Sequence, residues 1–118
     1  MSAPRPTPPI LIVDDDAAAR SMLALSLRQS GHPTLEAGSG PEALDVLRNG
    51  RCGSMVTDGK MSPMDGMELS RQAKRLDPGL RIALVSATVT EEDCHGCPID
   101  KFFHKPLPLE ELLRWLTA

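Results

Sequence analysis

The sequence predicts an α/β fold, a doubly wound domain in which helices cover both faces of one five-stranded parallel sheet. Short apolar runs of strand type alternate along the chain with segments whose apolar residues have helical spacing. Successive parallel strands need crossover connections, which place helices on both faces of the sheet. A chain of 118 residues is long enough for one hydrophobic core. We therefore expect a single domain over residues 10–118.

The first strand and helix follow a segment that has neither pattern. Residues 1–9 are rich in proline and predict a flexible leader outside the domain. Ile10–Val13 is an uninterrupted apolar run, as expected of a central strand that is buried on both faces. Three acidic residues come next, and Asp16 can cap a helix over residues 17–29 that Gly31 ends. This helix has apolar residues at helical spacing, namely Ala19, Met22, Leu23 and Leu27.

Two further units of strand and helix follow. Residues 33–37 predict a short strand, and a proline opens a helix over residues 41–49. Residues 54–57 predict a strand that ends at another carboxylate, Asp58, and a loop leads from there into a helix over residues 65–76. The unit of strand and helix therefore repeats, as the fold class requires.

The last part of the chain has two more strands and one more helix. Residues 81–85 form a buried apolar run that ends in Ser86, and residues 102–104 predict a strand that ends in Lys105. An amphipathic helix over residues 109–116 follows.

Polar side chains stand at the carboxyl ends of these strands. In doubly wound sheets, ligands bind at this edge, near the point where the strand order reverses. We expect five side chains to converge there: Asp14, Asp15, Asp58, Ser86 and Lys105. Three carboxylates so close together repel one another unless one is protonated or a cation lies between them. A hard divalent cation, Mg²⁺ or Mn²⁺, suits the side chains of Asp14, Asp15 and Asp58 with the backbone carbonyl of Lys60.

Each of these residues also has an ordinary structural interpretation when it is taken alone. The aspartates can cap the first helix, and a lysine at a strand end is commonly a solvated surface residue. Their combination favours phosphoryl chemistry, because a carboxylate nucleophile must approach an anion and needs that charge neutralised. The metal, the ammonium group of Lys105 and the hydroxyl group of Ser86 can do this.

Read in order, the motifs ILIVDDD, MVTDGKMSPMDGMEL, IALVSA and FFHKP resemble the receiver domains of response regulators in two-component signalling. The resemblance covers nearly the whole chain from residue 10 onward. It implies a flavodoxin-like strand order, 2-1-3-4-5. It also implies roles for the residues at the strand ends: Asp58 as the phosphoacceptor, Asp14 and Asp15 as the acidic pair, and Ser86 and Lys105 as the hydroxyl and ammonium groups beside them.

The resemblance further implies partners and a switch. A histidine kinase or a phosphotransfer protein would supply the phosphoryl group, and the chain would be a signalling phosphoacceptor rather than an enzyme. Phe102 stands three positions before Lys105. Its ring would turn inward when Ser86 moves toward the phosphoryl group, so that a downstream protein target meets a changed surface.

Two features depart from the family pattern. Pro63 stands one position later than usual in the loop after Asp58, which bears on how the carbonyl of Lys60 is presented. The stretch over residues 87–101 is also short and is interrupted by glycine and proline. We therefore expect the fourth helix to be shortened or missing, with at most a turn over residues 91–95, capped by Thr90. Receivers commonly dimerise through this face, so dimerisation is left open.

Charge and composition weigh against other classes of function. The formal net charge is −3, and the 13 Lys and Arg residues form no basic stripe, so direct nucleic-acid binding is not expected. No apolar run approaches the roughly 20 residues that span a bilayer, so no membrane association is expected and the predicted location is cytoplasmic.

Two rival functions and one motif stay open. A degenerate receiver would serve only as a docking module. A phosphohydrolase with an aspartyl-phosphate intermediate is suggested by Asp14 and Asp16, which match a strand end of the haloacid dehalogenase type, although no cap or substrate domain fits in the chain.

Cys94 and Cys97 have the spacing of a redox or zinc motif. Zinc needs four ligands and there is no second cysteine pair, so a tight turn is the simpler interpretation.

Overall fold

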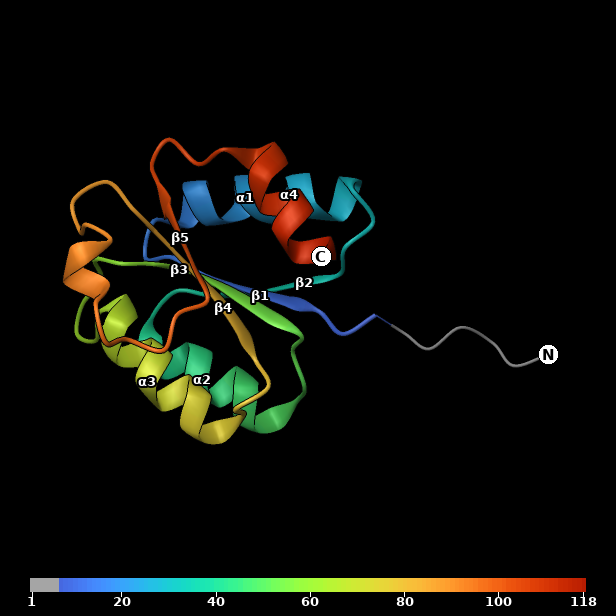
Figure 1. The fold of residues 1–118 in the computed structure, drawn as a ribbon. Helices are drawn as coiled ribbons and strands as arrows, with labels where there is room; N and C mark the ends of the chain where they lie inside the picture. The colour runs from blue at the N-terminus through green and yellow to red at the C-terminus, as the bar shows by residue number, and fades with distance from the viewer. Residues whose placement is uncertain (1–6) are drawn as a thin grey trace.

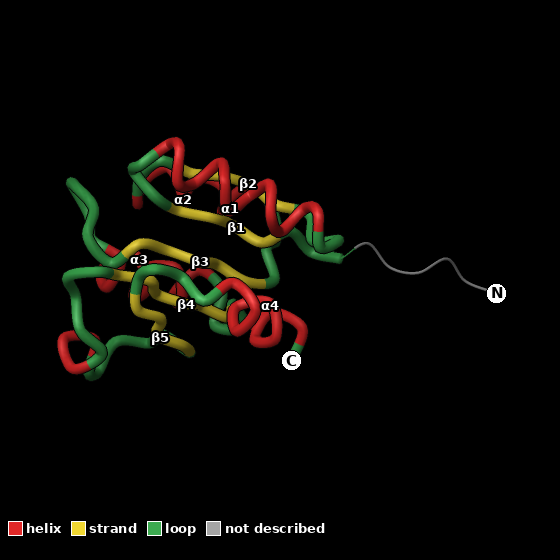
Figure 2. Tube along the Cα trace, turned by 90° about the horizontal axis from the view of Figure 1, so that it is seen from above, coloured by secondary structure: helices red, strands yellow, loops and turns green. Residues whose placement is uncertain are grey.

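The apolar runs pair side by side in one parallel sheet in the computed structural model, which describes residues 7–118 (Figure 1). Of the leader expected over residues 1–9, residues 1–6 lie outside the described residues, and its flexibility stays a prediction. The strands are β1 (Ile10–Val13), β2 (Thr34–Ala37), β3 (Ser54–Asp58), β4 (Arg81–Ser86) and β5 (Lys101–His104). Their order is β2-β1-β3-β4-β5, which is visible across the sheet in Figure 2 and confirms the predicted order.

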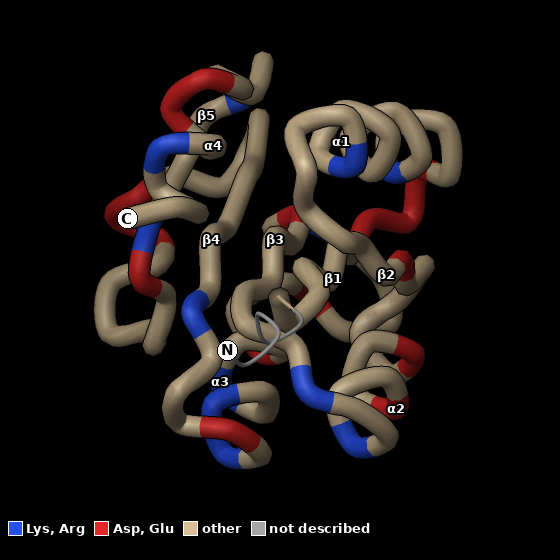
Figure 3. Tube along the Cα trace, turned by 90° about the vertical axis from the view of Figure 1, so that its right-hand side faces the viewer, with Lys and Arg blue, Asp and Glu red and all other residues tan. Residues whose placement is uncertain are grey.

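Within residues 7–118 four helices cover the sheet, two on each face (Figure 1). They are α1 (Ala17–Gln29), α2 (Gly40–Asn49), α3 (Gly66–Leu76) and α4 (Leu109–Thr117). α1 and α4 pack on one face and α2 and α3 on the other, an arrangement that Figure 3 shows end-on. The doubly wound α/β fold predicted from the sequence is therefore confirmed.

Observed helix and strand ends differ from the predicted ones by about one residue, and side-chain caps explain two of the differences. Asp65 is the N-cap of α3 rather than its first helical residue, because its carboxylate accepts the amide of Glu68 at 2.8 Å from an extended backbone. Ser39 caps α2 in the same way, through the amide of Glu42 at 3.2 Å, so this helix begins one residue before the proline.

The hydrophobic core lies in two clusters, one on each face of the sheet. Leu11 and Met55 point toward α2 and α3, whereas Ile12 and Val56 point toward α1 and α4. This alternation follows from the two-residue period of a strand, and it explains why the central strands are apolar at every position.

α1 buries a different set of residues from the one that its spacing suggested. Ala24 and Leu27 are fully buried, but Met22 is 72% exposed and Ala19 is exposed as well. Both line the pocket between α1 and the segment that leads from β5 into α4, where they stay open to solvent. The expectation that Ala19 and Met22 belong to the packed face is therefore wrong.

The fourth helix of the expected pattern is reduced to one short turn. Between β4 and β5 the chain forms a single 3₁₀ turn, η1 (Glu92–Cys94). Thr90 caps it: the amide of Asp93 donates to the Thr90 hydroxyl at 3.1 Å, and the amide of Thr90 donates to the Asp93 carboxylate at 2.9 Å. The predicted shortening, and the cap at Thr90, are confirmed.

The described helices also bear on membranes and on charge. None of them combines the length and the apolar character that a bilayer crossing requires. In Figure 3 the basic residues are spread over several helices and loops, in agreement with the absence of a basic stripe in the sequence.

Candidate functional site

Parallel pairing brings the carboxyl ends of β1, β3 and β5 to one edge of the sheet. Val13 pairs with Thr57, so the residues that follow each of them, Asp14 and Asp58, lie next to each other. Lys105 follows β5, where its backbone amide donates to the carbonyl of Ser86 at 3.0 Å. The side chains that the sequence predicted to converge therefore start from neighbouring positions.

The three aspartates form an acidic cluster. One carboxylate oxygen each from Asp14, Asp15 and Asp58 lies within 4.8 Å of the other two. Burial raises the pKa of Asp14; the charges of Asp58 and Asp15 raise it further, whereas the amide of Asp16 and the ammonium group of Lys105 oppose the rise. Burial and mutual repulsion thus disfavour the ionised carboxylates of the cluster, and a bound cation would offset both effects.

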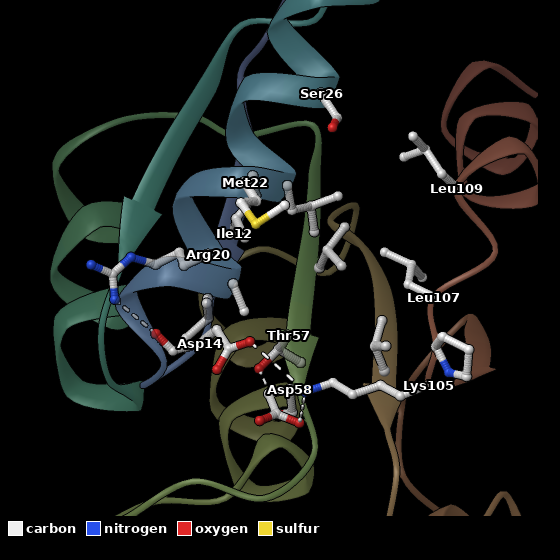
Figure 4. Close-up of a pocket in the computed structure, with 16 residues that line it drawn as sticks. Ile12, Asp14, Arg20, Met22, Ser26, Thr57, Asp58, Lys105, Leu107 and Leu109 are labelled. Atoms are coloured by element: carbon white, nitrogen blue, oxygen red, sulfur yellow. Dashed lines mark hydrogen bonds and ion pairs between the residues drawn. The ribbon is translucent and has the colours of Figure 1, made fainter.

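Lys105 lies against this cluster. Its Nζ atom is 3.5 Å from Oδ1 of Asp58 and 3.9 Å from Oδ2 of Asp14, as the dashed lines in Figure 4 indicate. The lysine side chain is 37% exposed, whereas the two carboxylates are 12% and 13% exposed. The ammonium group therefore lies between solvent and the carboxylates, where it can meet an incoming anion.

Asp16, the third consecutive aspartate, caps a helix and does not belong to the acidic cluster. Asp16 accepts the amides of Ala18 and Ala19 with one carboxylate oxygen, at 3.1 and 3.2 Å, and so caps α1. Among residues 7–118 the possible metal-holding group consists of Asp14, Asp15 and Asp58, without Asp16. The run of three aspartates is therefore divided between a helix cap and the acidic cluster.

The side chains of Ser86 and Phe102 make no hydrogen bond to the acidic cluster. Ser86 is 1% exposed, and its hydroxyl oxygen accepts the amides of Thr88 and Val89 at 3.2 and 2.9 Å. Phe102 is half-buried and meets the ring of His104 edge-on at 4.9 Å, whereas Phe103 points into the core. The strand alternation expected for the two phenylalanines is present, and the predicted role of Phe102 stays a prediction.

Sequence reasoning missed three residues that shape the site. Arg20 in α1 donates from Nη1 to the carbonyl of Asp14 at 2.8 Å (Figure 4). Thr57 is fully buried, and its hydroxyl donates to the carbonyl of Asp58 at 3.0 Å. Gly66 begins α3 so close to β3 that a Cβ atom there would overlap the carbonyl oxygen of Asp58. The glycine next to a helix cap carried a local signal. The contact of Thr57 joins adjacent residues, and the contact of Arg20 depends on how α1 packs beside the end of β1.

A mainly apolar pocket of about 390 Å³ adjoins Asp14, Asp58 and Lys105. Its floor is the sheet at Ile12, Val56 and Val85. One wall is α1 and the other is the segment that leads from β5 into α4, as Figure 4 shows with Met22 opposite Leu107 and Leu109. The charged cluster thus lies at the end of an apolar groove.

The donor set fits a divalent metal ion. Three carboxylate oxygens within 4.8 Å of one another are the ligands that Mg²⁺ and Mn²⁺ take in proteins. Lys60, whose carbonyl was predicted to complete the set, is exposed in the loop that leaves β3, and its role stays a prediction.

The chain is similar to known proteins along nearly its whole length. The family model described as response regulator receiver domain matches residues 10–117. The response regulator MprA from a Mycobacterium species (strain KMS) is 38% identical over 112 residues, which are 92% of this chain and 49% of the relative. The chain thus spans about half the length of the curated relatives it matches.

Solved structures agree with this match. A response regulator receiver protein from Pseudomonas putida superposes with a TM-score of 0.88 at 30% identity, covering 96% of this chain and 98% of the other. TrrA from Thermotoga maritima, a response regulator solved with Mg²⁺ and BeF, has a TM-score of 0.86, with 94% and 97% of the chains covered. At 24% identity, that likeness supports the fold alone.

Proposed function

The chain belongs to the response regulator receiver domain family of two-component signalling, and we propose that Asp58 is its phosphoacceptor. The observation that carries this proposal is the ion pair of 3.5 Å between Lys105 and Asp58, beside two further carboxylates at the carboxyl edge of the sheet. In the proposed reaction an oxygen of Asp58 attacks phosphorus in a phosphohistidine. The bond between phosphorus and the histidine nitrogen breaks, and the nitrogen keeps the electron pair.

The acidic cluster is proposed as the site of a divalent cation, Mg²⁺ or Mn²⁺. Asp14, Asp15 and Asp58 would hold it, together with the backbone carbonyl of Lys60. When bound, the ion would neutralise charge on the transferred phosphoryl group. The structure of TrrA in complex with Mg²⁺ and BeF is consistent with this proposal.

The chain's own groups have separate roles in the proposal. Lys105 binds a phosphoryl oxygen with its ammonium group, which already lies at the solvent side of the carboxylates. Ser86 keeps a hydroxyl proton that its two contacts with amides do not use, so it can donate to a second phosphoryl oxygen. If Ser86 moves toward the phosphoryl group, the amides of Thr88 and Val89 that it accepts would be drawn with it, and that movement would link phosphorylation to the loop after β4.

Phe102 is proposed as the residue that reports this movement. It is half-buried on the face of β5 opposite to Phe103, so it would pack inward only if space opened beside Ser86. The domain would then offer a changed surface to a downstream protein. A histidine kinase or a phosphotransfer protein is the proposed donor, and the expected cytoplasmic location belongs to this proposal, because donor and acceptor must share a compartment.

The test is phosphorylation by a small-molecule donor. The purified chain is incubated with acetyl phosphate and Mg²⁺, and intact mass spectrometry measures the added phosphoryl group. We expect one group per chain, removed by mild base because an acyl phosphate is labile, and no group when a chelator is present. Asp58→Asn should abolish the addition.

Asp16→Asn is the matched control. Asp16 lies next to the acidic pair but outside the cluster, and asparagine retains the cap of α1. This variant should be phosphorylated like the wild type. Phosphorylation that persists in Asp58→Ala would overturn the assignment of the phosphoacceptor.

The same assay separates the rival functions. A degenerate receiver would take up no phosphoryl group, and a phosphohydrolase would turn over free phosphoesters. The use of Asp16 as a helix cap argues against the phosphohydrolase, because that interpretation needed Asp16 at the acidic site. A phosphotransfer profile against purified histidine kinases would then identify the donor.

A further inference from the structure

The connection between β4 and β5 contains a pair of cysteines that the proposed signalling function does not use. Cys94 ends η1 and is 4% exposed, and Cys97 follows three residues later and is partly exposed. Both thiols are free, and both line a surface pocket of about 430 Å³. We propose that Cys94 and Cys97 form a reversible oxidation site, in which a hydroperoxide converts the two thiols into an intramolecular disulfide.

The backbone already holds the two cysteines as a disulfide needs them. The amide of Cys97 donates to the carbonyl of Cys94 at 2.9 Å. Between them His95 has φ −57° and ψ 128°, and Gly96 has φ 82°, which are the values of a type II turn. Such a turn brings its first and last Cα atoms within about 7 Å, and a disulfide joins Cα atoms about 4.4–6.8 Å apart. Gly96 makes the turn possible, because its positive φ is a conformation that other residues rarely adopt.

The two sulfurs differ in exposure and in nearby charge, and these differences determine which of them reacts first with the oxidant. Arg71 donates from Nη2 to the sulfur of Cys97 at 3.5 Å, so the more exposed sulfur lies beside a positive charge. A thiolate is the reactive form of cysteine, and neighbouring cations stabilise it. Burial raises the pKa of Cys94, and the nearby Cys97 raises it further. Cys97 is therefore the attacking sulfur and Cys94 the resolving one.

The chemistry balances with a hydroperoxide as the oxidant. The thiolate of Cys97 attacks one peroxide oxygen and the O–O bond breaks. Cys97 becomes a sulfenic acid, and the other oxygen leaves with the electron pair as hydroxide or alkoxide. The sulfur of Cys94 then attacks the sulfur of Cys97, the S–S bond forms, and the thiol proton leaves with the hydroxyl group as water. The two sulfurs together lose two electrons, which reduce the peroxide.

The geometry favours a disulfide over a metal site at this position. Within the part of the chain that the structure describes, the group of metal-competent residues is the aspartate cluster, and neither cysteine belongs to it. Cys52 is also unlike the pair, because it lies in the core beside β3 and is 2% exposed. The expected product is therefore one crosslink within the turn, in the pocket that Phe102 also lines.

In the test, the purified folded protein is treated with one equivalent of hydrogen peroxide. The thiols that remain are then labelled with a maleimide under denaturing conditions, and peptide mass spectrometry locates the labels. The supporting result is a Cys94–Cys97 crosslink, lighter by two hydrogen atoms, with Cys52 still labelled and all three thiols restored by dithiothreitol. Free thiols at both positions after treatment, or crosslinked dimers in place of the internal crosslink, would overturn the proposal.

Single substitutions sharpen the result. Cys97→Ser should show no crosslink. Arg71→Gln should slow its formation by about twofold to fivefold, the effect expected of one partly exposed charge. Arg75→Gln, on the same helix, should leave the rate of crosslink formation unchanged. Equal rates in the two arginine variants would overturn the assignment of Cys97 as the attacking sulfur. Asp58→Asn should oxidise like the wild type, so this test can succeed or fail independently of the proposed phosphorylation.

Discussion

The close contact between α3 and β3 predicts that Gly66→Ala destabilises the protein. A Cβ atom at residue 66 would overlap the carbonyl oxygen of Asp58 and approach the Cα atom of Gly59 to 3.0 Å. Both neighbours are backbone atoms, so a change of side-chain rotamer cannot relieve the contact. The start of α3 must move away from the end of β3, which is the strand that presents Asp58.

The expected magnitude follows from three contributions. Overpacking of this kind costs about 1–3 kcal/mol. The movement also weakens the hydrogen bond of 2.9 Å from the amide of Gly66 to the carbonyl of Gly59, which contributes about 1 kcal/mol. Alanine in place of glycine gains at most about 1 kcal/mol in helix propensity. The free energy of unfolding should therefore fall by about 2 kcal/mol.

Gly50→Ala is the matched control. Gly50 has an extended backbone with φ −166°, and a Cβ atom there would meet nothing within 4 Å. This substitution should leave stability unchanged or raise it by at most about 1 kcal/mol. Urea unfolding followed by circular dichroism measures both variants, and the m-value should not change. Equal midpoints for Gly66→Ala and Gly50→Ala would refute the close contact.

Three further predictions concern the core and the acidic cluster. Phe103→Ala should lower the free energy of unfolding by about 3–5 kcal/mol, because Phe103 is 3% exposed. Phe102→Ala should lower it by less than about 1.5 kcal/mol. Equal losses in urea unfolding would contradict the placement of the two rings on opposite faces of β5. Burial raises the folded-state pKa of Asp14 above its unfolded value of 3.8. In the presence of a chelator, the free energy of unfolding should therefore fall as the pH rises through the folded-state pKa. Asp14→Asn should weaken this pH dependence, and identical profiles for the variant and the wild type would contradict the raised pKa of Asp14. Mg²⁺ at ten times its Kd should stabilise the wild type by about 1.4 kcal/mol but Asp58→Ala markedly less, as measured by thermal unfolding; equal stabilisation would exclude the carboxylate of Asp58 as a ligand.

Local sequence patterns were sufficient for most of the strands and helices. Ile10–Val13 is apolar at every position because both faces of β1 are covered, and such a run has few alternatives to a central strand. The short stretch between β4 and β5, which contains glycine and proline, predicted that no full helix forms there, because both residues disfavour helical backbone. The order of the strands came from the family resemblance, since periodicity does not report which strands pair.

Parts of the candidate site also followed from residue type and position. Carboxylates directly after apolar runs meet at one edge of a parallel sheet, and Asp14, Asp15, Asp58 and Lys105 are found there. The different roles of the consecutive aspartates also agree with the prediction, with Asp16 as the cap of α1 and Asp14 and Asp15 in the acidic cluster. The start of α1 directs the carboxylate of Asp16 toward the helix amides and leaves that of Asp15 within reach of Asp58.

By itself, the sequence determined which segments become strands and helices and which chemical groups stand at the strand ends. Both properties are set by neighbours within a few residues. Tertiary structure alone decided that Met22 faces solvent, that Arg20 holds the carbonyl of Asp14, and that α3 begins against Asp58. Each of these depends on how a helix is oriented against the sheet, and the periodicity of the local sequence does not determine that orientation.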